Sequence, residues 1–317
     1  MYRKSEPYVL VFGASVVDIF GFSNSNYRPN NSTPGNVKIS FGGVCRNIAE
    51  NMARVGVNTK FISILGDDET GRGILDHSKI IGYDMEDTLI LKDGGTPTYM
   101  AIIDENGEMV SAIADMKSID EMDFEFIDSK AEIIKNAKYT FLDADSPKNL
   151  EYILTTFKGY SEFILDPVSS VKAERIKHLI KHFHTIKPNR HEAEILTGFK
   201  IKDDSDLKRA GDFFLSLGIK NVFISLDEDG IYFTNGTNSG KIKAHNVSVV
   251  NVTGAGDSFV AGLGYGYMEM LPIEETVKFA IAMSIITIAH AETIHPNMNF
   301  EYVQEVVKST KWEEVYY

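Results

Sequence analysis

The sequence predicts an α/β protein in which helices cover both faces of a mostly parallel sheet. Short apolar runs alternate with amphipathic stretches along most of the 317 residues. The runs have the length of buried strands, and the stretches between them suit crossover helices. Near residue 100 a strand–turn–strand segment interrupts this alternation. That interruption predicts a small second sheet beside the main one.

The expected strands of the main sheet share a short apolar run bounded by polar or turn-forming residues. They lie at Tyr8–Val17, Lys60–Leu65, Tyr139–Leu142, Glu162–Leu165, Thr185–Ile186 and Asn221–Leu226. Leu207–Leu217 and Ile273–Ala289 are examples of the amphipathic stretches between them. Since a large α/β fold can use this chain length as one unit, residues 1–317 are interpreted as a single domain with a small appendage.

The appendage is predicted from two strand-like segments and the turn between them. Thr96–Asp104 and Glu108–Asp115 are joined through an Asn-Gly pair at 106–107. Asn-Gly between two such runs is a strong hairpin indication. A hairpin inserted into an alternating α/β pattern suits an accessory sheet that closes over a ligand. We therefore expect lid segments at about 20–41 and 96–115.

Charge and cysteine content restrict the partners of the protein. The net charge of −13 argues against nucleic acids and anionic membranes. No run approaches the roughly 18 apolar residues of a membrane-spanning helix. The single cysteine, Cys45, excludes an internal disulfide and fits the reducing cytoplasm. An acidic protein also repels phosphates weakly, so any phosphate site must be built locally from backbone N–H groups or a few cations.

Polar side chains follow several of the expected strands. In open parallel sheets, ligands bind beyond the carboxyl ends of the strands, which is where these side chains fall. Each of them could equally be a helix N-cap or a turn residue, because Asp and Asn favour those positions too. Their recurrence along one edge of the sheet favours a binding site. The residues are Asp18, Asp143, Asp145, Asp166, Asn189 and Glu192.

The strongest local motif is the heptapeptide Asn251–Asp257, Asn-Val-Thr-Gly-Ala-Gly-Asp. It lies between a strand-like run and an apolar helical stretch. Small residues at a helix start let backbone N–H groups approach an anion, and the helix dipole favours negative charge there. A carboxylate in that position, Asp257, suits a general base that accepts the proton of an attacking hydroxyl. The alternative is a tight turn with Asp257 as an ordinary early-helix acid.

A second motif, Gly42-Gly43, precedes a predicted helix. Paired glycines permit close approach of a ligand to the backbone. Asn47 falls in the first turn of that helix, off its apolar stripe, and is a candidate for hydrogen bonds to sugar hydroxyls. The alternative is a plain tight turn with a solvated Asn47.

Together these motifs resemble the signatures of the ribokinase-like carbohydrate kinases, the PfkB family. Gly42-Gly43 with Asn47 resembles the N-terminal signature, and Gly254–Asp257 resembles the C-terminal one. Lys187–Glu192, Lys-Pro-Asn-Arg-His-Glu, is similar to the N-x-x-E element between them. The resemblance covers essentially the whole chain. It implies a ribokinase-like three-layer sandwich with a mostly parallel sheet and a small β-sheet lid.

Within that family the chain resembles the pseudouridine kinases most. The segments that carry this resemblance are Pro34–Ala49, Ala112–Met116, Asp166–Ser169 and Asn251–Asp257. It implies ATP-dependent phosphorylation of a hydroxyl of a sugar or nucleoside, with pseudouridine 5′-phosphate as the expected product. A kinase for ribose, another carbohydrate or another nucleoside is the alternative. A non-catalytic sugar-binding relative is a further one, although such a protein would not need a carboxylate in an anion site.

The resemblance also implies roles for individual residues. Asp257 is the expected catalytic base, and the N–H groups of Gly254, Ala255 and Gly256 form the expected anion hole. The expected substrate-binding residues are Asp18, Gly42, Gly43 and Asn47, with Asp115 as a candidate partner of the base N1–H. The expected ATP-binding residues are Lys187, Asn189, Ser225 and Gly230. Glu192 is expected to serve Mg²⁺ and its waters.

Two residues, Asp227 and Asn251, depart from the family pattern. Asp227 stands where the family often has glycine, so the acidic run Asp227–Asp229 is expected to point away from the nucleotide. Asn251 stands where the family has an aspartate that often helps bind an activating monovalent cation, which predicts weak K⁺ activation. Lid sheets of this family often pair, which implies a homodimer through the lid.

Overall fold

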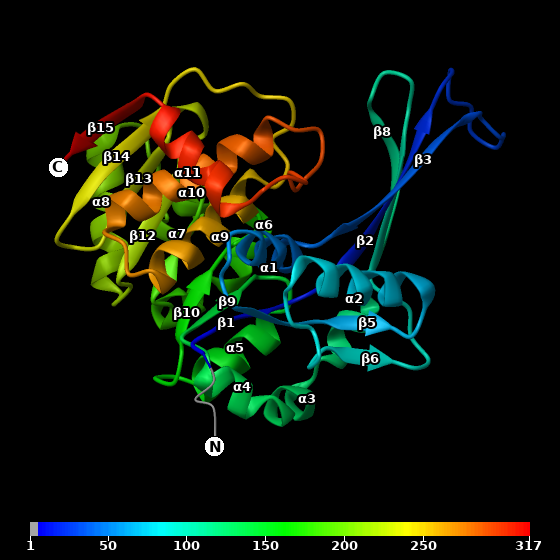
Figure 1. Ribbon diagram of the computed structural model, residues 1–317, viewed down its shortest axis with the longest axis horizontal. Coiled ribbons are helices and arrows are strands. Elements are labelled where there is room, and N and C mark those ends of the chain that lie inside the picture. Colours follow the sequence, from blue (N-terminus) through cyan, green and yellow to red (C-terminus); the bar gives the residue numbers. More distant parts are fainter. Residues whose placement is uncertain (1–5) are drawn as a thin grey trace.

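The computed structural model describes residues 6–317, and its main sheet has nine strands (Figure 1). Their order is β15-β14-β13-β12-β11-β10-β9-β1-β4. The six strands from β12 to β4 run parallel, whereas β13, β14 and β15 continue the sheet antiparallel. The predicted mostly parallel sheet is therefore confirmed. The bounds are β1 (Val9–Phe12), β4 (Thr59–Ile62), β9 (Tyr139–Leu142), β10 (Glu162–Leu165), β11 (Thr185–Ile186), β12 (Asn221–Ser225), β13 (Ile231–Thr234), β14 (Ser239–Ala244) and β15 (Trp312–Tyr316).

Helices form a layer on each face of this sheet, as the sequence predicts. Alternate side chains of β1 join different cores: Val9 and Val11 pack with one helix layer, and Leu10 and Phe12 with the other. The first layer contains α1 (Val44–Arg54), α2 (Glu69–Ile81), α9 (Ala255–Met268), α10 (Ile273–Ile288) and α11 (Phe300–Ser309). The second contains α3 (Phe124–Ser129), α4 (Ala131–Asn136), α5 (Pro147–Thr156), α6 (Ser170–Ile176), α7 (Arg190–Thr197) and α8 (Asp204–Ser216). Within residues 6–317, no helix has the length and apolarity to cross a membrane.

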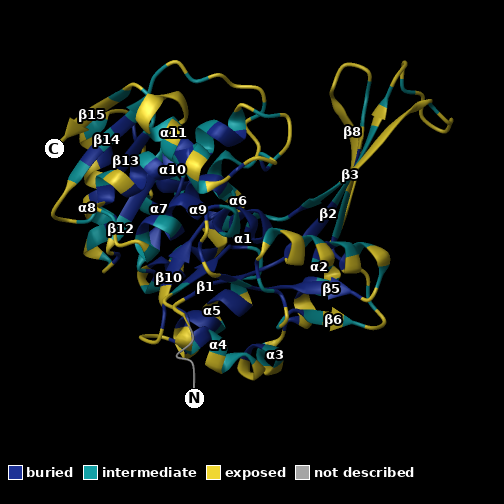
Figure 2. Ribbon diagram, in the orientation of Figure 1, coloured by how far each residue is buried: buried dark blue, intermediate teal, exposed yellow. Residues whose placement is uncertain are grey.

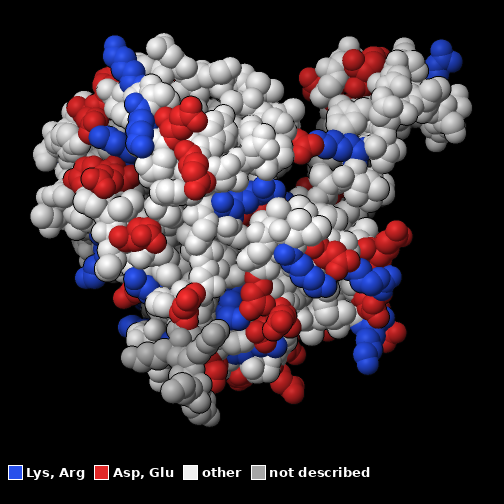
Figure 3. All heavy atoms as spheres, in the orientation of Figure 1, with Lys and Arg blue, Asp and Glu red and all other residues white. Residues whose placement is uncertain are grey.

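A separate four-stranded sheet projects from the body (Figure 1). Its order is β3 (Gly35–Gly42), β2 (Val16–Ser23), β7 (Thr98–Ile103) and β8 (Met109–Asp115). Figure 2 shows that its outer end is exposed while its base lies against the buried body. Lys38 on β3 approaches the segment after α10, where its Nζ lies 3.7 Å from Glu292 Oε1. Opposite charges meet between this sheet and the body in Figure 3.

Two expected strands are divided where the chain leaves the main sheet. The run Tyr8–Val17 becomes β1 and β2, and Lys60–Leu65 becomes β4 and β5 (Ile64–Gly66), which pairs with β6 (Leu89–Leu91). Buried Ser15 and Ser63 lie at the two breaks, and the Ser15 N–H donates to Ser63 Oγ at 2.8 Å. These breaks depend on contacts 48 residues apart, so apolar run length alone did not predict them.

Candidate active site

Asp257 and Asn47 are in direct contact although 210 residues separate them in the sequence. Asn47 Nδ2 donates a hydrogen bond to Asp257 Oδ2 over 2.7 Å. The contact arises because α1 and α9 pack side by side, which places their first turns together. The two glycine-containing motifs predicted from the sequence thus meet at one point.

The surroundings of Asp257 give its carboxyl group a pKa suited to proton transfer. Burial and the nearby Asp166 carboxylate raise this pKa, while the Asn47 hydrogen bond and the charges of Lys187 and Arg46 oppose them. The result is a pKa raised to about 7. A carboxyl group with that pKa changes protonation near neutral pH, which is the condition that favours a general base.

The turn before α9 requires glycine at position 254, and position 256 in the first turn of the helix has little free space. Gly254 has φ 83°, and a Cβ there would lie 2.3 Å from the carbonyl oxygen of Thr293. A Cβ on Gly256 would lie 3.0 Å from Lys187 Nζ. The N–H groups of a first helical turn have no intrahelical partner, so they are available to an anion. Of the predicted donors, the N–H of Ala255 already contacts Val252 O at 3.3 Å.

A buried ion pair supplies positive charge beside this turn. Lys187 Nζ lies 3.1 Å from Asp166 Oδ2, and both side chains are almost fully buried. Burial opposes the charged form of Lys187, but the carboxylates of Asp166, Glu192 and Asp257 outweigh it and raise its pKa. Lys187 therefore remains an ammonium next to the backbone of Gly256. The sequence does not predict this ion pair, because Asp166 follows β10 whereas Lys187 follows β11.

The Asp18 side chain, on β2, packs tightly against the Gly42-Gly43 turn. A Cβ on Gly42 would lie 1.9 Å from Asp18 Oδ2, so only glycine leaves room for that carboxylate. Gly43 has φ 96°, and a Cβ there would lie 2.7 Å from Ala14 O. Burial raises the pKa of Asp18, and the Arg46 charge opposes the shift. The turn sits directly before α1, which carries Asn47 in its first turn.

Asp115 lies on the opposite face of the small sheet from Asp18. Its cross-strand partner is Thr98, which is paired with Val17. Because successive side chains of a strand alternate between faces, Val17 and Asp115 share one face and Asp18 points to the other. Asp115 therefore faces away from the Asp18 side of the small sheet, and its expected contact with the base N1–H stays a prediction. The strand register decides on which face of the sheet Asp115 lies. The register depends on the pairing partners in other strands, so the local sequence does not predict it.

Asn189 and Glu192 lie at the start of α7 and satisfy each other. Asn189 Oδ1 accepts from the Glu192 N–H at 2.9 Å, and Glu192 Oε2 accepts from the Asn189 N–H at 2.8 Å. This is a capping box, so the structural alternative for Asn189 holds in this conformation. Burial raises the pKa of Glu192. Both residues remain beside Lys187 and Asp166, at the edge where ligands bind in such sheets.

The segment from Ser225 to Gly230 lies beside the capping box. Ser225 forms a parallel bridge with Asn189. Gly230 has φ 86°, and a Cβ there would lie 2.2 Å from Ile242 O. The acidic run between them is exposed, as expected, and Asp229 is 3.6 Å from Arg190 Nη2. Asp227 has φ 53°, a conformation that favours the glycine often found there.

Metal binding has a partial basis in this arrangement. Within residues 6–317, no three His, Cys, Asp or Glu side chains are gathered as ligands for one ion. Mg²⁺ usually retains waters and takes only one or two carboxylates together with substrate phosphates. The buried Glu192 near Lys187 and Asp166 fits such a limited contribution. The residues present therefore suit an ion that arrives with a nucleotide.

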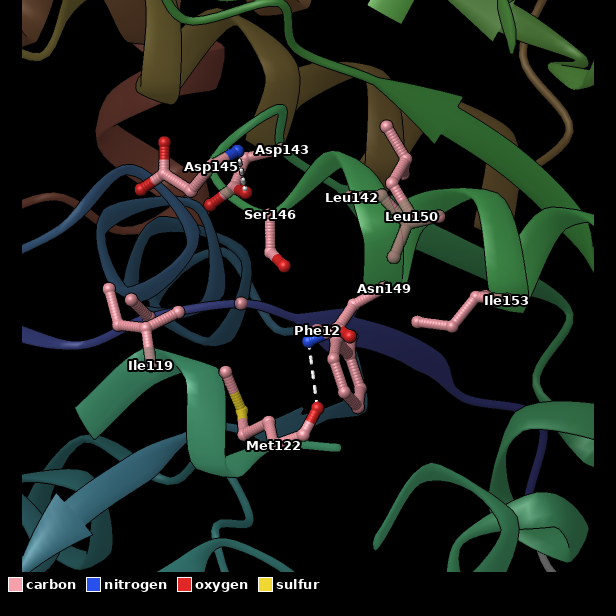
Figure 4. Close-up of a pocket in the computed structure, with 12 residues that line it drawn as sticks. Phe12, Ile119, Met122, Leu142, Asp143, Asp145, Ser146, Asn149, Leu150 and Ile153 are labelled. Atoms are coloured by element: carbon pink, nitrogen blue, oxygen red, sulfur yellow. Dashed lines mark hydrogen bonds between the residues drawn. The ribbon is translucent and has the colours of Figure 1, made fainter. Parts of the chain in front are cut away.

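A small cavity lies at the carboxyl end of β9 (Figure 4). Its volume is about 20 Å³, enough for about one water molecule. Asp143 lies at its edge, accepts from the Asp145 N–H at 3.0 Å, and is contacted by the Cys45 thiol at 3.1 Å. Burial and Asp145 raise the pKa of Asp143 to about 7. The cavity is too small for a sugar or a base, so it does not extend the site in this conformation.

Sequence comparison identifies relatives along nearly the whole chain. The profile described as pfkB family carbohydrate kinase matches residues 6–299. The pseudouridine kinase of Escherichia coli (strain K12) is 31% identical over 310 residues, which are 97% of this chain and 99% of that protein. The guanosine-inosine kinase of Exiguobacterium acetylicum is 26% identical over 288 residues, which are 90% of this chain and 95% of that protein.

Solved structures have the same fold. A crystal structure of a candidate sugar kinase from Clostridium perfringens has a TM-score of 0.96 at 66% identity, covering 99% of both chains. The ribokinase of Arabidopsis thaliana, solved with ribose and ATP, has a TM-score of 0.83 at 20% identity. It covers 95% of this chain and 99% of its own, and at that identity the likeness concerns the fold alone. The chain belongs to the pfkB family of carbohydrate kinases, which makes it a phosphotransferase for a small sugar or nucleoside.

Proposed function

We propose that this protein transfers the γ-phosphate of ATP to the 5′-hydroxyl of pseudouridine. The observation that carries the catalytic part is the 2.7 Å contact between Asn47 and Asp257 at the start of α9. The 31% identity to a pseudouridine kinase over 97% of the chain supports the choice of substrate. A cytoplasmic location belongs to the same proposal, because ATP and a free, buried Cys45 both fit that compartment.

In this proposal, different residues of the site accept the proton, stabilise the phosphoryl group and hold the sugar. Asp257 accepts the proton of the 5′-hydroxyl while its oxygen attacks the γ-phosphorus, and the bond to the β-phosphate oxygen breaks. The N–H groups of Gly254 and Gly256 and the Lys187 ammonium stabilise the charge on the transferring phosphoryl group, and the Ala255 N–H joins them by leaving the carbonyl oxygen of Val252. Asp18, the Gly42-Gly43 backbone and Asn47 hold the ribose hydroxyls. These groups stabilise the transition state effectively because they are already fixed in place before the substrate arrives.

The nucleotide occupies the neighbouring edge of the sheet. Asn189, Ser225 and Gly230 border it, and Glu192 would hold Mg²⁺ through water molecules. Mg²⁺ supplies neutralising charge to the phosphates when bound. The capping box must then exchange one of its internal contacts for a water or phosphate contact. Residues of about 20–41 and 96–115 act as the lid of a single domain spanning 1–317, of which residues 1–5 lie outside the described part.

The lid also provides a surface for a second copy of the chain. On the face opposite Asp18, large apolar side chains of β3, β7 and β8 are exposed: Val37, Ile39, Met100, Ile102 and Ile113. An exposed apolar face of this kind marks an interaction site. A two-fold arrangement lets identical faces cover each other. We expect Ile39→Lys to reduce the molecular mass in solution from dimer to monomer, whereas the control Ile80→Lys, on exposed α2, should leave it unchanged.

The substrate is tested by comparing kcat/KM for pseudouridine, uridine, adenosine, ribose and fructose at saturating ATP and Mg²⁺. Pseudouridine has a ring N1–H that uridine lacks, and a site that satisfies this donor rejects the analogue strongly because a polar group stays unpaired. We expect the highest value for pseudouridine. A clear preference for ribose or adenosine would replace the proposed substrate while leaving the phosphotransferase activity in place.

A further inference from the structure

A buried arginine lies directly behind Asn47. Arg46 is 3% exposed, and its guanidinium contacts three different groups at once. Nη2 donates to Asn47 Oδ1 at 2.7 Å, and Nη1 donates to Glu50 Oε2 at 2.6 Å. Nε donates to the carbonyl oxygen of Gly42 at 3.2 Å. One side chain therefore touches the Asn47 amide and the glycine turn against which Asp18 packs.

The first of these contacts fixes which end of the Asn47 amide faces Asp257. A guanidinium only donates, so the atom that faces it must be the amide oxygen. The amide nitrogen then has to point the other way, toward the Asp257 carboxylate, where it donates over 2.7 Å. A reversed amide would set its oxygen against the carboxylate and its NH₂ against the guanidinium, so two contacts would become repulsive.

We propose that Arg46 is a positioning residue that locks Asn47 as a hydrogen-bond donor and thereby keeps Asp257 available as the base. This inference rests on the proposed role of Asp257. Without Arg46, no guanidinium fixes the Asn47 amide with its nitrogen toward Asp257. A positive charge near the Asp257 carboxylate is also lost. Both changes favour the protonated carboxyl group, which cannot accept the proton of the substrate.

Glu50 holds the Arg46 guanidinium in position throughout the pH range in which the enzyme would work. Burial would raise the pKa of Glu50, but its hydrogen bond with His77 and the charges of Arg46 and Arg54 lower it to about 2. Glu50 therefore stays ionised and anchors the guanidinium. The groups that face Arg46 are Glu50, Tyr83 and Asp18, and those that face Asp257 are Asn47, Asp166, Lys187 and Arg46.

The chain offers a matched control for the test. Arg54 pairs with the same Glu50, at 2.7 Å from Nη2 to Oε1, but its other hydrogen bond goes to Pro296 O rather than to the site. Arg46→Met and Arg54→Met each remove one cationic partner of Glu50. Only the first removes the contact with Asn47. Arg46→Lys is a second variant, since it keeps the charge beside Glu50 although one ammonium cannot span all three partners.

The experiment measures kcat/KM for the purified full-length variants from pH 5.5 to 9.5 with the substrate preferred by the wild type. The acidic limb is the part of the pH profile in which kcat/KM falls as the pH is lowered. For Arg46→Met we expect this limb to shift to a pH about one unit higher. At pH 6 the variant should therefore lose about tenfold more of its activity, relative to the wild type, than at pH 9. Arg46→Lys should move the limb in the same direction by less. Arg54→Met should lower the melting temperature without moving the limb.

The outcomes separate this inference from its premise. If Arg46→Met and Arg46→Lys leave the limb where the wild type has it, or if Arg54→Met moves it as far, the positioning role is refuted. Should Asp257→Asn retain the wild-type rate, the role of Asp257 as base fails and the inference fails with it. Loss of activity in Asp257→Asn together with an unmoved limb in both Arg46 variants refutes the Arg46 role alone.

Discussion

The acceptor end and the nucleotide end of the candidate site are held together by different kinds of contact. At the acceptor end, Asn47 and Asp257 join two helices across 210 residues of sequence. At the nucleotide end, Asn189 and Glu192 bond each other within one turn of α7. The first pair exists only when the tertiary fold is complete, whereas the second is local. Substitutions at the first should therefore act on catalysis, and those at the second partly on helix stability.

The strongest way to break the acceptor end is Asp257→Asn. The variant keeps the shape of the side chain and loses the base, so kcat should fall by roughly 10²–10⁴. The same change should stabilise the fold at pH 8. The native pKa of about 7 lies above the ordinary aspartate range, so the wild type loses stability as pH rises from about 4 to 7, and asparagine carries no such charge.

Both effects are measurable on one preparation, by steady-state kinetics and by thermal unfolding at pH 4.5 and pH 8. The gain in melting temperature should be confined to the higher pH. A variant with near wild-type kcat would remove Asp257 from the chemistry. A variant destabilised at pH 8 would contradict the burial of a charged carboxylate there.

The next largest effect is expected from the side chains proposed to grip the sugar. Asp18→Ala and Asn47→Ala leave hydroxyl groups unpaired in a buried site, which costs about 1–3 kcal/mol, or roughly 5- to 150-fold in KM. Asn47→Ala should lower kcat as well, because Asn47 also contacts Asp257. Asp115→Ala is the control, since Asp115 lies on the other face of the small sheet. If Asp18→Ala and Asn47→Ala keep the wild-type KM, as the control should, the sugar binds elsewhere.

A smaller effect is expected at the nucleotide end. Asn189→Ala removes an N-cap, which costs about 1 kcal/mol of the free energy of unfolding. Asp203→Ala is a matched control because Asp203 caps α8 by accepting from the Asp206 N–H at 3.0 Å. Both variants should lose similar stability by urea unfolding, but only Asn189→Ala should raise KM for ATP. A KM for ATP that stays constant in Asn189→Ala would reduce Asn189 to a structural cap.

The smallest effect concerns monovalent cations. Asn251 carries no charge, and its Nδ2 already donates to the carbonyl oxygen of Ala291 at 3.1 Å. An amide that donates to a carbonyl competes with any cation for that oxygen. We therefore expect kcat in potassium chloride to exceed kcat in choline chloride only weakly at equal ionic strength. A steep dependence of kcat on K⁺ would contradict this, and Asn251→Asp tests whether a carboxylate introduces it.

The sequence alone predicts the α/β fold and both glycine-containing motifs, because strands, crossover helices and tight glycine turns depend on local residue patterns. It does not predict the face on which Asp115 lies, since pairing partners on other strands decide it. Arg46 was also missed. A pattern was present in Arg46, Glu50 and Arg54, which repeat at four-residue spacing along α1, but only the packed structure shows that this face is buried.

The contact between Lys38 and Glu292 has a consequence for turnover. Residues 291–293 touch the small sheet through Glu292 and the α9 turn through the Ala291 and Thr293 carbonyl groups. Both charged side chains are about half exposed, and such pairs contribute only about 0–1 kcal/mol. If the small sheet moves as the proposed lid, a contact of that size biases it toward one position without trapping it. Added salt should weaken this bias, so the exchange of substrate and product should respond to ionic strength even where the chemical step does not.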